Sequence, residues 1–358
     1  MTRGSSLNVG VVGAGYVATA VHIPFLKKLA SANLMAIADS IPDRASAVAA
    51  QYGIPLHASD YRTLLDRDDI RVIDICTPPQ YHAQIAAEAV EAGKDVIVEK
   101  PVAMNMAEFS SLSAAVRRRT DSHVGVVLNL RYMPLIQSAI EVLHRGQLGQ
   151  ILGVSATVHT AVPTAGWFSD PVLSRYGVLY DYLPHVLDLA LWALQARPLM
   201  VRCVSSRPGG SGFYVTADLY SPLVGNPSLL VDVAWTNATS IRSLHVWGTE
   251  RDIFLDLQDQ FWYTARGHMT PAGRLGELVR RATGLAKRAA GGRTFIKYGA
   301  MAYHRALLSD FLAAFASRQC PRVSLADGLL HVEVIDAAIR SHQAETAVTA
   351  SPEAVIAS

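Results

Sequence analysis

A glycine-rich turn that follows a short apolar run constrains the fold of this chain more than any other feature. Residues 13–18 read Gly-Ala-Gly-Tyr-Val-Ala, directly after the apolar run 7–12, and a helical pattern follows them. Gly13 permits a tight turn, Gly15 lets a pyrophosphate approach the backbone, and Ala18 allows close packing of the helix on the strand. The pattern predicts a dinucleotide-binding turn formed by Gly13, Gly15, Tyr16, Val17 and Ala18.

An acidic residue ends the second apolar run. Asp39 follows the run 34–38, at about the 20-residue spacing at which a carboxylate accepts hydrogen bonds from an adenosine ribose. Because a carboxylate there would repel a 2′-phosphate, the sequence favours NAD(H) over NADP(H). The alternative is a glycine turn in a Rossmann-like domain that binds another ligand.

In the first third of the chain, apolar runs alternate with amphipathic helical segments. The runs lie at 7–12, 34–38, 72–76, 96–99 and 122–128, and the helical segments at 17–29, 42–52, 81–91 and 106–118. This alternation is typical of a parallel sheet covered by helices on both faces, which is the doubly wound α/β class.

The pattern changes after residue 149. Strand-like runs then follow one another without helices as far as residue 265, and helical segments come later, at 303–317 and 326–342. Such a series of strands predicts a mainly antiparallel sheet in an α+β domain. We therefore expect an NAD-binding Rossmann domain at 1–128, a substrate-binding and oligomerisation domain at 129–345, and a loose tail at 346–358.

Charge and cysteine usage exclude other classes of protein. The 358 residues carry a formal net charge of +2, which gives no support for nucleic-acid binding. Cys76, Cys203 and Cys320 are far apart and form no Cys/His cluster, so we expect no metal site and three reduced thiols in a cytoplasmic protein. Short, glycine-interrupted apolar runs predict neither a signal peptide nor a membrane-spanning helix.

Polar residues follow two of the buried runs, at the edge of the sheet where ligands bind in open α/β folds. Thr77-Pro78-Pro79 follows the third run and Glu99-Lys100-Pro101 follows the fourth. A lysine that faces a cofactor crevice loses solvent, which suits it to proton transfer near neutral pH, and Glu99 would orient it. The alternatives are an ordinary loop and a surface lysine.

A second candidate pair precedes the apolar run 186–194. Asp181 and His185 stand four residues apart, so both side chains lie on one face if this segment begins a helix. Histidine is the side chain best suited to proton transfer near neutral pH. The alternative is a capping aspartate and a core histidine with satisfied hydrogen bonds.

Five motifs occur in a fixed order: the turn at 13–18, Thr77-Pro78-Pro79, Glu99-Lys100-Pro101, Asn129-x-Arg131-x-x-Pro134 and Asp181-x-x-x-His185. Together they resemble the glucose–fructose oxidoreductase and inositol dehydrogenase (Gfo/Idh/MocA) family over nearly the whole chain. The resemblance implies an N-terminal Rossmann domain, a C-terminal domain with an open-faced sheet, and homodimers or homotetramers built through the faces of that sheet.

The resemblance also implies roles for individual residues in reversible hydride transfer between a carbinol carbon and a nicotinamide. Lys100 would hydrogen-bond the reacting oxygen, His185 would donate or accept the proton, and Asp181 would orient the substrate or the imidazole. Further cofactor contacts would come from Thr77, Pro78, His82, Glu99 and Asn129. Further substrate contacts would come from Arg131, Tyr132 and Trp167.

Two features leave the substrate open. The family usually has a glycine two residues after the aspartate, where this chain has Leu183 followed by Pro184, whose ring fixes φ. The segment 274–293 is basic and amphipathic. We expect it to form a helix packed on its own domain, and the alternatives are an anionic membrane surface or a phosphorylated substrate.

The leading hypothesis is an oxidoreductase that uses NAD, in preference to NADP, to transfer hydride to or from a hydroxyl or keto carbon of a sugar, polyol, inositol or sugar derivative. One alternative is an enzyme of the same fold that oxidises its substrate transiently for elimination or bond cleavage and recycles its NAD. The other is a non-catalytic sensor of NAD or a sugar. The joint presence of Lys100, Asp181 and His185 favours an enzyme, because a binding module needs no proton relay.

Overall fold

A computed structural model describes residues 6–163, 166–206, 211–236, 240–258, 260–265 and 302–350. The chain divides into two compact units. The first unit comprises residues 1–129 and 300–332, and the second unit comprises residues 130–299 and 333–358.

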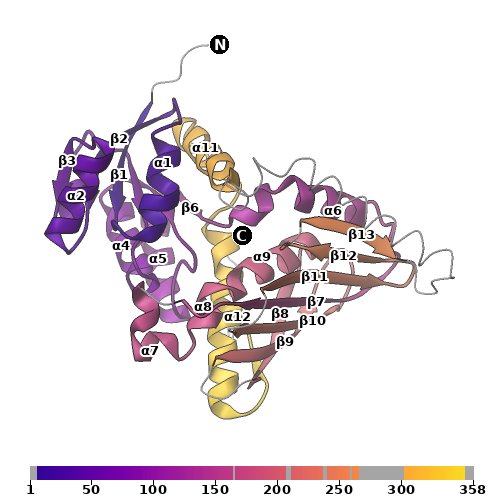
Figure 1. The fold of residues 1–358 in the computed structure, drawn as a ribbon. Coiled ribbons are helices and arrows are strands. Elements are labelled where there is room, and N and C mark those ends of the chain that lie inside the picture. Colours follow the sequence, from indigo (N-terminus) through magenta and orange to yellow (C-terminus); the bar gives the residue numbers. More distant parts are fainter. Residues whose placement is uncertain are drawn as a thin grey trace. The chain divides into compact units, whose positions relative to one another are not determined.

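A parallel sheet of six strands, in the order β3-β2-β1-β4-β5-β6, forms the first unit (Figure 1). The strands are β1 (Leu7–Val12), β2 (Ala32–Ala38), β3 (Leu56–Ala58), β4 (Val72–Ile75), β5 (Asp95–Val98) and β6 (Val124–Val126). The central strands are apolar and buried, as expected where helices cover both faces of a sheet. The predicted doubly wound class is confirmed.

Helices and helical turns connect these strands. They are the π-helical turn η1 (Ala18–His22), α1 (Ile23–Leu26), α2 (Pro42–Tyr52), α3 (Arg62–Leu65), the 3₁₀ turn η2 (Pro79–Tyr81), α4 (His82–Glu91), α5 (Met106–Arg118) and α11 (Ala302–Ala316). Asn105 caps α5, because its side chain accepts a hydrogen bond from the N–H of Glu108.

The strand order reverses between β1 and β4, since β2 and β3 lie on one side of β1 and β4 to β6 on the other. Ligands of open α/β sheets bind outside the carboxyl ends of the strands at such a reversal. Gly13 follows β1 there with a φ of +97°, and an added Cβ atom would lie 2.8 Å from the backbone carbon and oxygen of Cys76. The turn therefore requires glycine at this position.

A sheet of eight strands, in the order β13-β12-β11-β7-β10-β9-β8-β14, forms the second unit. Strands β7 and β10 are parallel, and every other neighbouring pair is antiparallel. The strands are β7 (Ile151–Thr160), β8 (Arg197–Ser205), β9 (Gly212–Tyr220), β10 (Ser228–Trp235), β11 (Ile241–Gly248), β12 (Asp252–Asp256), β13 (Phe261–Ala265) and β14 (Val348–Thr349). The mainly antiparallel sheet predicted for this part of the chain is confirmed.

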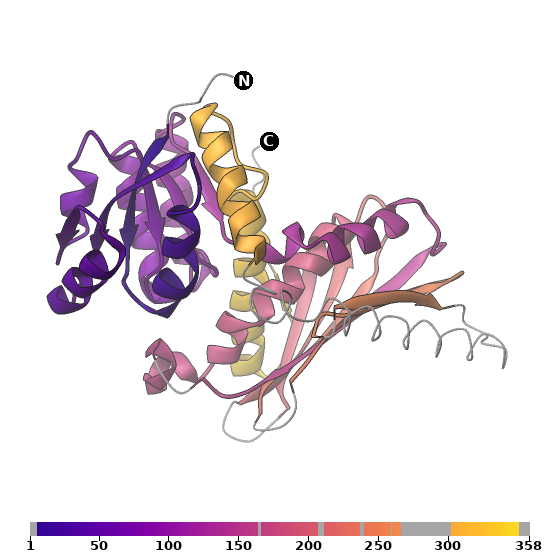
Figure 2. The same ribbon diagram turned by 45° about the horizontal axis from the view of Figure 1, so that its top comes forward.

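Helices pack along one face of this sheet (Figure 2). They include α6 (Pro134–His144), α8 (Gly177–Asp181) and α9 (Leu183–Leu194), and the unit also contains η4 (Gly166–Ser169) and α7 (Pro171–Ser174). The 3₁₀ turn η3 (Asn129–Tyr132) and helix α12 (Leu325–Ala344) run from one unit into the other.

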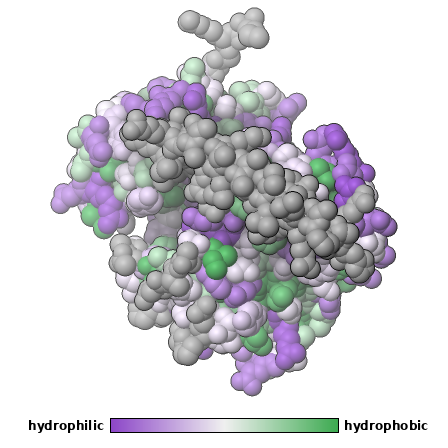
Figure 3. All heavy atoms as spheres, turned by 45° about the vertical axis from the view of Figure 1, so that its right-hand side comes forward, coloured by the Kyte–Doolittle hydropathy of each residue, from purple (hydrophilic) through white to green (hydrophobic). Residues whose placement is uncertain are grey.

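Figure 3 shows apolar side chains among polar ones on one side of the molecule.

Two parts of the expected domain division differ from the contacts in the structure. The segment 300–332, which the sequence assigned to the second domain, groups with the first unit. The ring of Phe311 on α11 covers Gly125 of β6, and the N–H of Val126 donates to the carbonyl oxygen of Val323 at 3.2 Å. These contacts between residues far apart in the chain assign the segment 300–332 to the first unit, although its neighbours in sequence belong to the second.

The expected loose tail begins inside the sheet. Val348 and Thr349 pair with β8, and Ala350 is fully buried. The small residues after position 345 predicted a loose tail because they carry little apolar surface. The structure differs because pairing with β8 satisfies the backbone groups of this segment. Residues 351–358 lie outside the described part of the chain.

Candidate active site

The glycine turn and Asp39 form one hydrogen-bonded structure at the carboxyl edge of the parallel sheet. One carboxylate oxygen of Asp39 accepts the N–H of Ala14 at 2.8 Å, and the other accepts the N–H of Ile41 at 2.9 Å. Arg44, which is half exposed, lies 3.6 Å from the same carboxylate. Asp39 is thus fixed beside the turn, where a ribose of a bound dinucleotide would meet it.

The turn itself fits a dinucleotide. A Cβ atom added at Gly15 meets no protein atom within 4 Å, whereas one added at Gly13 meets the backbone after β4. The backbone of Gly15 is therefore open to close approach by a pyrophosphate, and Gly13 serves the turn. Tyr16 is 75% exposed and Ala18 is fully buried, which agrees with the packing role predicted for Ala18.

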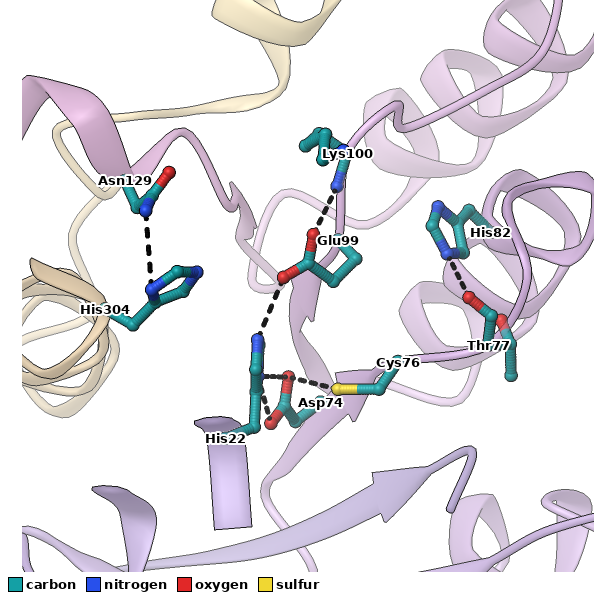
Figure 4. Close-up of polar contacts among 9 residues, drawn as sticks. All are labelled: His22, Asp74, Cys76, Thr77, His82, Glu99, Lys100, Asn129 and His304. Atoms are coloured by element: carbon teal, nitrogen blue, oxygen red, sulfur yellow. Dashed lines mark hydrogen bonds and ion pairs between the residues drawn. The ribbon is translucent and has the colours of Figure 1, made fainter. Parts of the chain in front are cut away.

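His82 holds two loops of the site together. Its Nδ1 atom lies 2.7 Å from the carbonyl oxygen of Pro101. Its Nε2 atom lies 2.8 Å from the carbonyl oxygen of Thr77 (Figure 4). The ring is buried, and burial lowers its pKa against the opposing effect of the two carbonyl groups. Both ring nitrogens thus face the backbone, so His82 positions the loops that carry Thr77-Pro78 and Lys100.

Glu99 is held by a buried histidine that the sequence did not point to. The Nε2 atom of His22 lies 3.0 Å from Oε1 of Glu99, and its Nδ1 atom lies 2.9 and 3.0 Å from the two oxygens of Asp74. The N–H of Lys100 donates to Oε2 of Glu99 at 3.1 Å (Figure 4). The series Asp74, His22, Glu99 therefore ends at the backbone of Lys100.

The charges of this series support one another. Burial alone would raise the pKa of Glu99, but the hydrogen bond and the charge of His22 outweigh it and hold that pKa at about 2. Burial opposes protonation of His22, yet Asp74 raises the pKa of His22 well above its usual value. An imidazolium between two carboxylates follows, which keeps Glu99 ionised and able to accept from Lys100.

Two further residues border this series, and one of them raises the question of a metal. His22, Asp74 and Cys76 place ligand atoms within 4.8 Å of one another, but burial raises the pKa of the Cys76 thiol to about 12. The thiol also lies 3.9 Å from a carboxylate oxygen of Asp74, so Asp74 contacts both the thiol and the imidazole of His22. His304 of α11 lies with its ring 6.1 Å from that of His22 and within 3.4 Å of the side chain of Asn129, so Asn129 borders this series.

The sequence carried one overlooked signal for this series. Asp74 stands inside the short apolar strand β4 and is fully buried. Buried carboxylates are rare unless they are paired, so an aspartate in such a strand indicates a buried cation nearby. Nothing local identified that cation as His22 in the turn after β1.

Asp181 and His185 lie on two successive helices of the second unit. Helix α8 ends at Asp181, helix α9 begins at Leu183, and Tyr182 joins them with φ of −104°. Tyr182 itself keeps right-handed helical backbone angles, and its carbonyl oxygen accepts the N–H of His185 at 3.2 Å. That Asp181 and His185 share one helical face therefore stays a prediction, and the ring of Tyr182 lies 6.4 Å from that of His185. The side chain of Leu183, which replaces the family's usual glycine, is buried in the interior of this unit.

Arg131, predicted as a substrate contact, is held in a buried ion pair. Its Nε atom lies 2.9 and 3.0 Å from the carboxylate oxygens of Asp188, and the guanidinium stacks 5.1 Å from the Trp192 ring centroid. Both charged groups are buried. This pair attaches η3, which also carries Tyr132, to helix α9.

Aromatic side chains gather near η4, where Trp167 was predicted to contact the substrate. The rings of Trp167 and Phe168 lie 3.9 Å apart, and Phe168 meets the ring of Trp235 edge-on at 5.6 Å. Lys100 belongs to the first unit, whereas Asp181, His185 and this aromatic group belong to the second.

Other predictions meet the structure only in part. Cys76, Cys203 and Cys320 form no disulfide. Among the described residues, no helix is long and apolar enough to cross a membrane. The basic segment 274–293 lies outside the described residues.

Two family models match the chain. The model for the oxidoreductase family with an NAD-binding Rossmann fold matches residues 7–126. The model for the GFO/IDH/MocA C-terminal domain matches residues 136–253.

Named relatives match part of the chain. A levoglucosan dehydrogenase of Pseudarthrobacter phenanthrenivorans is 32% identical over 197 residues, which are 52% of this chain and 50% of that protein. A D-glucoside 3-dehydrogenase of Escherichia coli is 30% identical over 53% of this chain and 54% of that protein. The matched part thus spans about half the length of these curated relatives.

Solved structures share the fold over nearly the whole chain. Levoglucosan dehydrogenase in complex with NADH has a TM-score of 0.76 at 22% identity and covers 97% of this chain and 100% of that chain. GenD2 from gentamicin A biosynthesis, in complex with NAD, has a TM-score of 0.78 at 21% identity and covers 98% of this chain and 97% of that chain.

Proposed function

Because the chain belongs to the Gfo/Idh/MocA oxidoreductase family, we propose that it is an NAD-dependent dehydrogenase or reductase acting on a hydroxyl or keto carbon of a sugar, polyol or inositol. The observation that carries the proposal is the connection of Lys100, through Glu99 and His22, to a buried aspartate at the reversal point of the Rossmann sheet. These contacts fix the backbone of Lys100 at the end of β5, on the carboxyl edge of the sheet where the glycine turn also lies.

Bound NAD accepts or supplies the hydride at its nicotinamide ring. The groups of this chain position the substrate and move the proton. In the direction of oxidation, the ammonium of Lys100 donates a hydrogen bond to the reacting oxygen, His185 takes the hydroxyl proton, and Asp181 orients the substrate or the imidazole. In reduction the same proton moves from His185 to the oxygen.

The substrate class rests on the names of relatives. They refer to levoglucosan, a D-glucoside and inositol. Aromatic side chains beside hydrogen-bonding groups suit such polyhydroxylated substrates, because the rings cover carbon-bound hydrogens and the polar groups bind hydroxyls. We therefore assign Trp167 and Phe168 to the substrate side of the reaction.

Steady-state reduction of NAD⁺ with levoglucosan, myo-inositol and methyl D-glucoside tests the function. We expect Lys100→Met to lower kcat/KM by about 100-fold or more, the range of a lost general acid–base group, with the Kd for NADH within about threefold of wild type. The exposed Lys28→Met is the matched control. A wild-type rate in Lys100→Met would overturn the assignment, and NAD that resists dialysis would favour the recycled-cofactor alternative.

The open face of the eight-stranded sheet supports a second part of the proposal, a homodimer or homotetramer. Large apolar side chains stand exposed on this face of β8, β9 and β10, namely Val204, Tyr214 and Leu230. Exposed apolar patches on a rigid sheet are typical of protein interfaces. Light scattering should show an oligomer for the wild type and a monomer for the double variant Tyr214→Asp, Leu230→Asp, and a monomeric wild type would contradict this part.

A further inference from the structure

Arg242 lies at the start of β11, on the face of the sheet that the helices cover. It pairs in register with Val158 of β7, and the buried side chains of Val158 and Leu244 mark that face. The guanidinium lies 5.3 Å from the ring centroid of Tyr182, with one terminal nitrogen 3.5 Å from the Tyr182 hydroxyl. Arg242 thus lies beside Tyr182, the residue that joins α8 to α9 and that precedes His185 by three positions.

The charge of Arg242 has no carboxylate partner in the part of the chain that the structure describes. No Asp or Glu oxygen there forms an ion pair with it, and its Nε atom is buried with no acceptor among those residues. Arg131 in the same unit binds both oxygens of Asp188. A guanidinium placed against a protein interior without a carboxylate is costly, so such sites commonly bind an anion.

A second buried donor lies on the same face. Trp235 pairs in register with Thr160 of β7, and Arg242 with Val158, so the two residues flank β7 from its two sides. Two strand spacings and an offset of two residues along β7 put their backbones about 12 Å apart. The indole Nε1 atom is buried and has no acceptor among the described residues. The ring packs on the backbone of Gly177, leaving no room for a Cβ atom there.

Two buried donors without acceptors, next to aromatic rings, favour a ligand rich in oxygen. Unsatisfied buried donors are rare in folded proteins, and those present often have a functional reason. The Nε edge of a guanidinium matches two oxygens of a carboxylate or phosphate, whereas an indole N–H donates a single hydrogen bond to a neutral or charged oxygen. Arg242 therefore suits the charged end of a ligand and Trp235 an oxygen elsewhere on it.

We propose that Arg242 determines specificity by binding an anionic group, a carboxylate or a phosphate, of the sugar substrate, and that Trp235 donates to a second oxygen of the same molecule. The proposal rests on the proposed dehydrogenase function. Tyr182 is a neighbour of both residues, with its ring 5.3 Å from the Arg242 guanidinium and 6.4 Å from the His185 ring, so one small substrate would meet both Arg242 and His185.

Three sugars that differ in one group test the proposal: D-glucuronate, D-glucose 6-phosphate and D-glucose. Two measurements are made with each, kcat/KM with NAD⁺ and the shift in melting temperature with NADH present. We expect one acidic sugar to exceed glucose by at least tenfold in kcat/KM and to give the larger thermal shift. A preference for D-glucuronate would identify the anionic group as a carboxylate, and a preference for D-glucose 6-phosphate would identify it as a phosphate.

The variant Arg242→Met should remove this preference through KM and leave the values for glucose within about twofold of wild type. Arg242→Lys keeps the charge without the planar donor pair, so it should retain part of the preference for an acidic sugar. It replaces the Met variant in the test if that variant does not fold. The control is Arg145→Met, since Arg145 is exposed directly after α6 in the same unit. We expect this control to behave as wild type.

Equal responses to acidic and neutral sugars in the wild type, including no response to any of them, would overturn the proposal. An acid preference that survives in Arg242→Met would also overturn it. The thermal shift separates this inference from the proposed function, because it reports sugar binding without hydride transfer. Acid-specific binding that depends on Arg242, without NAD⁺ reduction, would support the inference and count against the dehydrogenase.

Discussion

The Nε2 atom of His22 lies 3.0 Å from Oε1 of Glu99, 77 positions later in the chain. Because the other oxygen of Glu99 accepts the N–H of Lys100, this contact links the turn after β1 to the loop that presents the candidate catalytic lysine. A fully buried histidine thus acts at a distance from any substrate, as a positioning residue.

Replacing His22 should slow turnover more than it weakens cofactor binding. In His22→Gln, Glu99 loses its cationic partner and the backbone of Lys100 loses a fixed acceptor. We expect kcat to fall by about 10- to 100-fold, the effect of a misplacement of the order of 1 Å, with the Kd for NADH within about threefold. The control is His57→Gln, at an exposed position of β3, and equal loss of kcat in both variants would contradict this role.

The ion pair of Glu99 and His22 should make the free energy of unfolding depend on pH, in opposite directions for the two residues. The pKa of Glu99 is lowered to about 2 from 4.5, so its contribution is present above pH 4.5 and is lost as the pH falls towards 2. The pKa of His22 is raised well above 6.5, so its contribution is complete below pH 6.5 and is lost as the pH rises through the raised value. Urea unfolding of wild type and His22→Gln between pH 6 and pH 10 should show the difference shrinking as the pH rises.

Replacing the two glycines of the turn by alanine should affect different properties, stability for Gly13 and NADH binding for Gly15. Gly13→Ala places a Cβ atom 2.8 Å from the backbone of Cys76 at a φ of +97°, so we expect a lower melting temperature. Gly15→Ala meets no protein atom within 4 Å, so we expect an unchanged melting temperature and NADH affinity weaker by tenfold or more. A Gly15→Ala variant that binds NADH normally would argue against a pyrophosphate at this position.

Asp39 should set the preference between the two dinucleotides. In Asp39→Ser the charge that repels a 2′-phosphate is gone, while Arg44 remains 3.6 Å from that position. We expect the ratio of NAD⁺ to NADP⁺ in kcat/KM to fall by at least tenfold. Asp43→Ser, in the exposed first turn of α2, should leave the ratio unchanged, and an unchanged ratio in both variants would show that Asp39 is not the determinant.

The pair of Arg131 and Asp188 should matter for stability. In Asp188→Asn the buried guanidinium loses its counter-charge, which should lower the free energy of unfolding by about 3–5 kcal/mol. Asp218→Asn, at an exposed position of β9, should change it by about 0.5 kcal/mol or less. Denaturant unfolding measures both, and a stable Asp188→Asn enzyme with a raised KM would instead support the substrate contact first predicted for Arg131.

Several candidate site residues could be predicted from the sequence because their signals are local. The glycine turn and Asp39 follow from spacing along one βαβ unit, and Glu99-Lys100 follows from its place at the end of a strand. The partners of these residues could not be located. His22 has apolar neighbours in a helical segment, and its pairing with Asp74 and Glu99 depends on β1, β4 and β5 lying side by side in the sheet.

By itself, the sequence determined the class of both sheets, because a hydrophobic period reports which faces of each segment are buried. It also predicted a dinucleotide site at the glycine turn, since such a turn needs specific residues. Only the tertiary structure decided that His82 braces two loops, that Arg131 is paired, and that Arg242 is not paired with any described carboxylate. Whether a charged side chain is paired depends on neighbours contributed by distant strands and helices, and no local pattern encodes those neighbours.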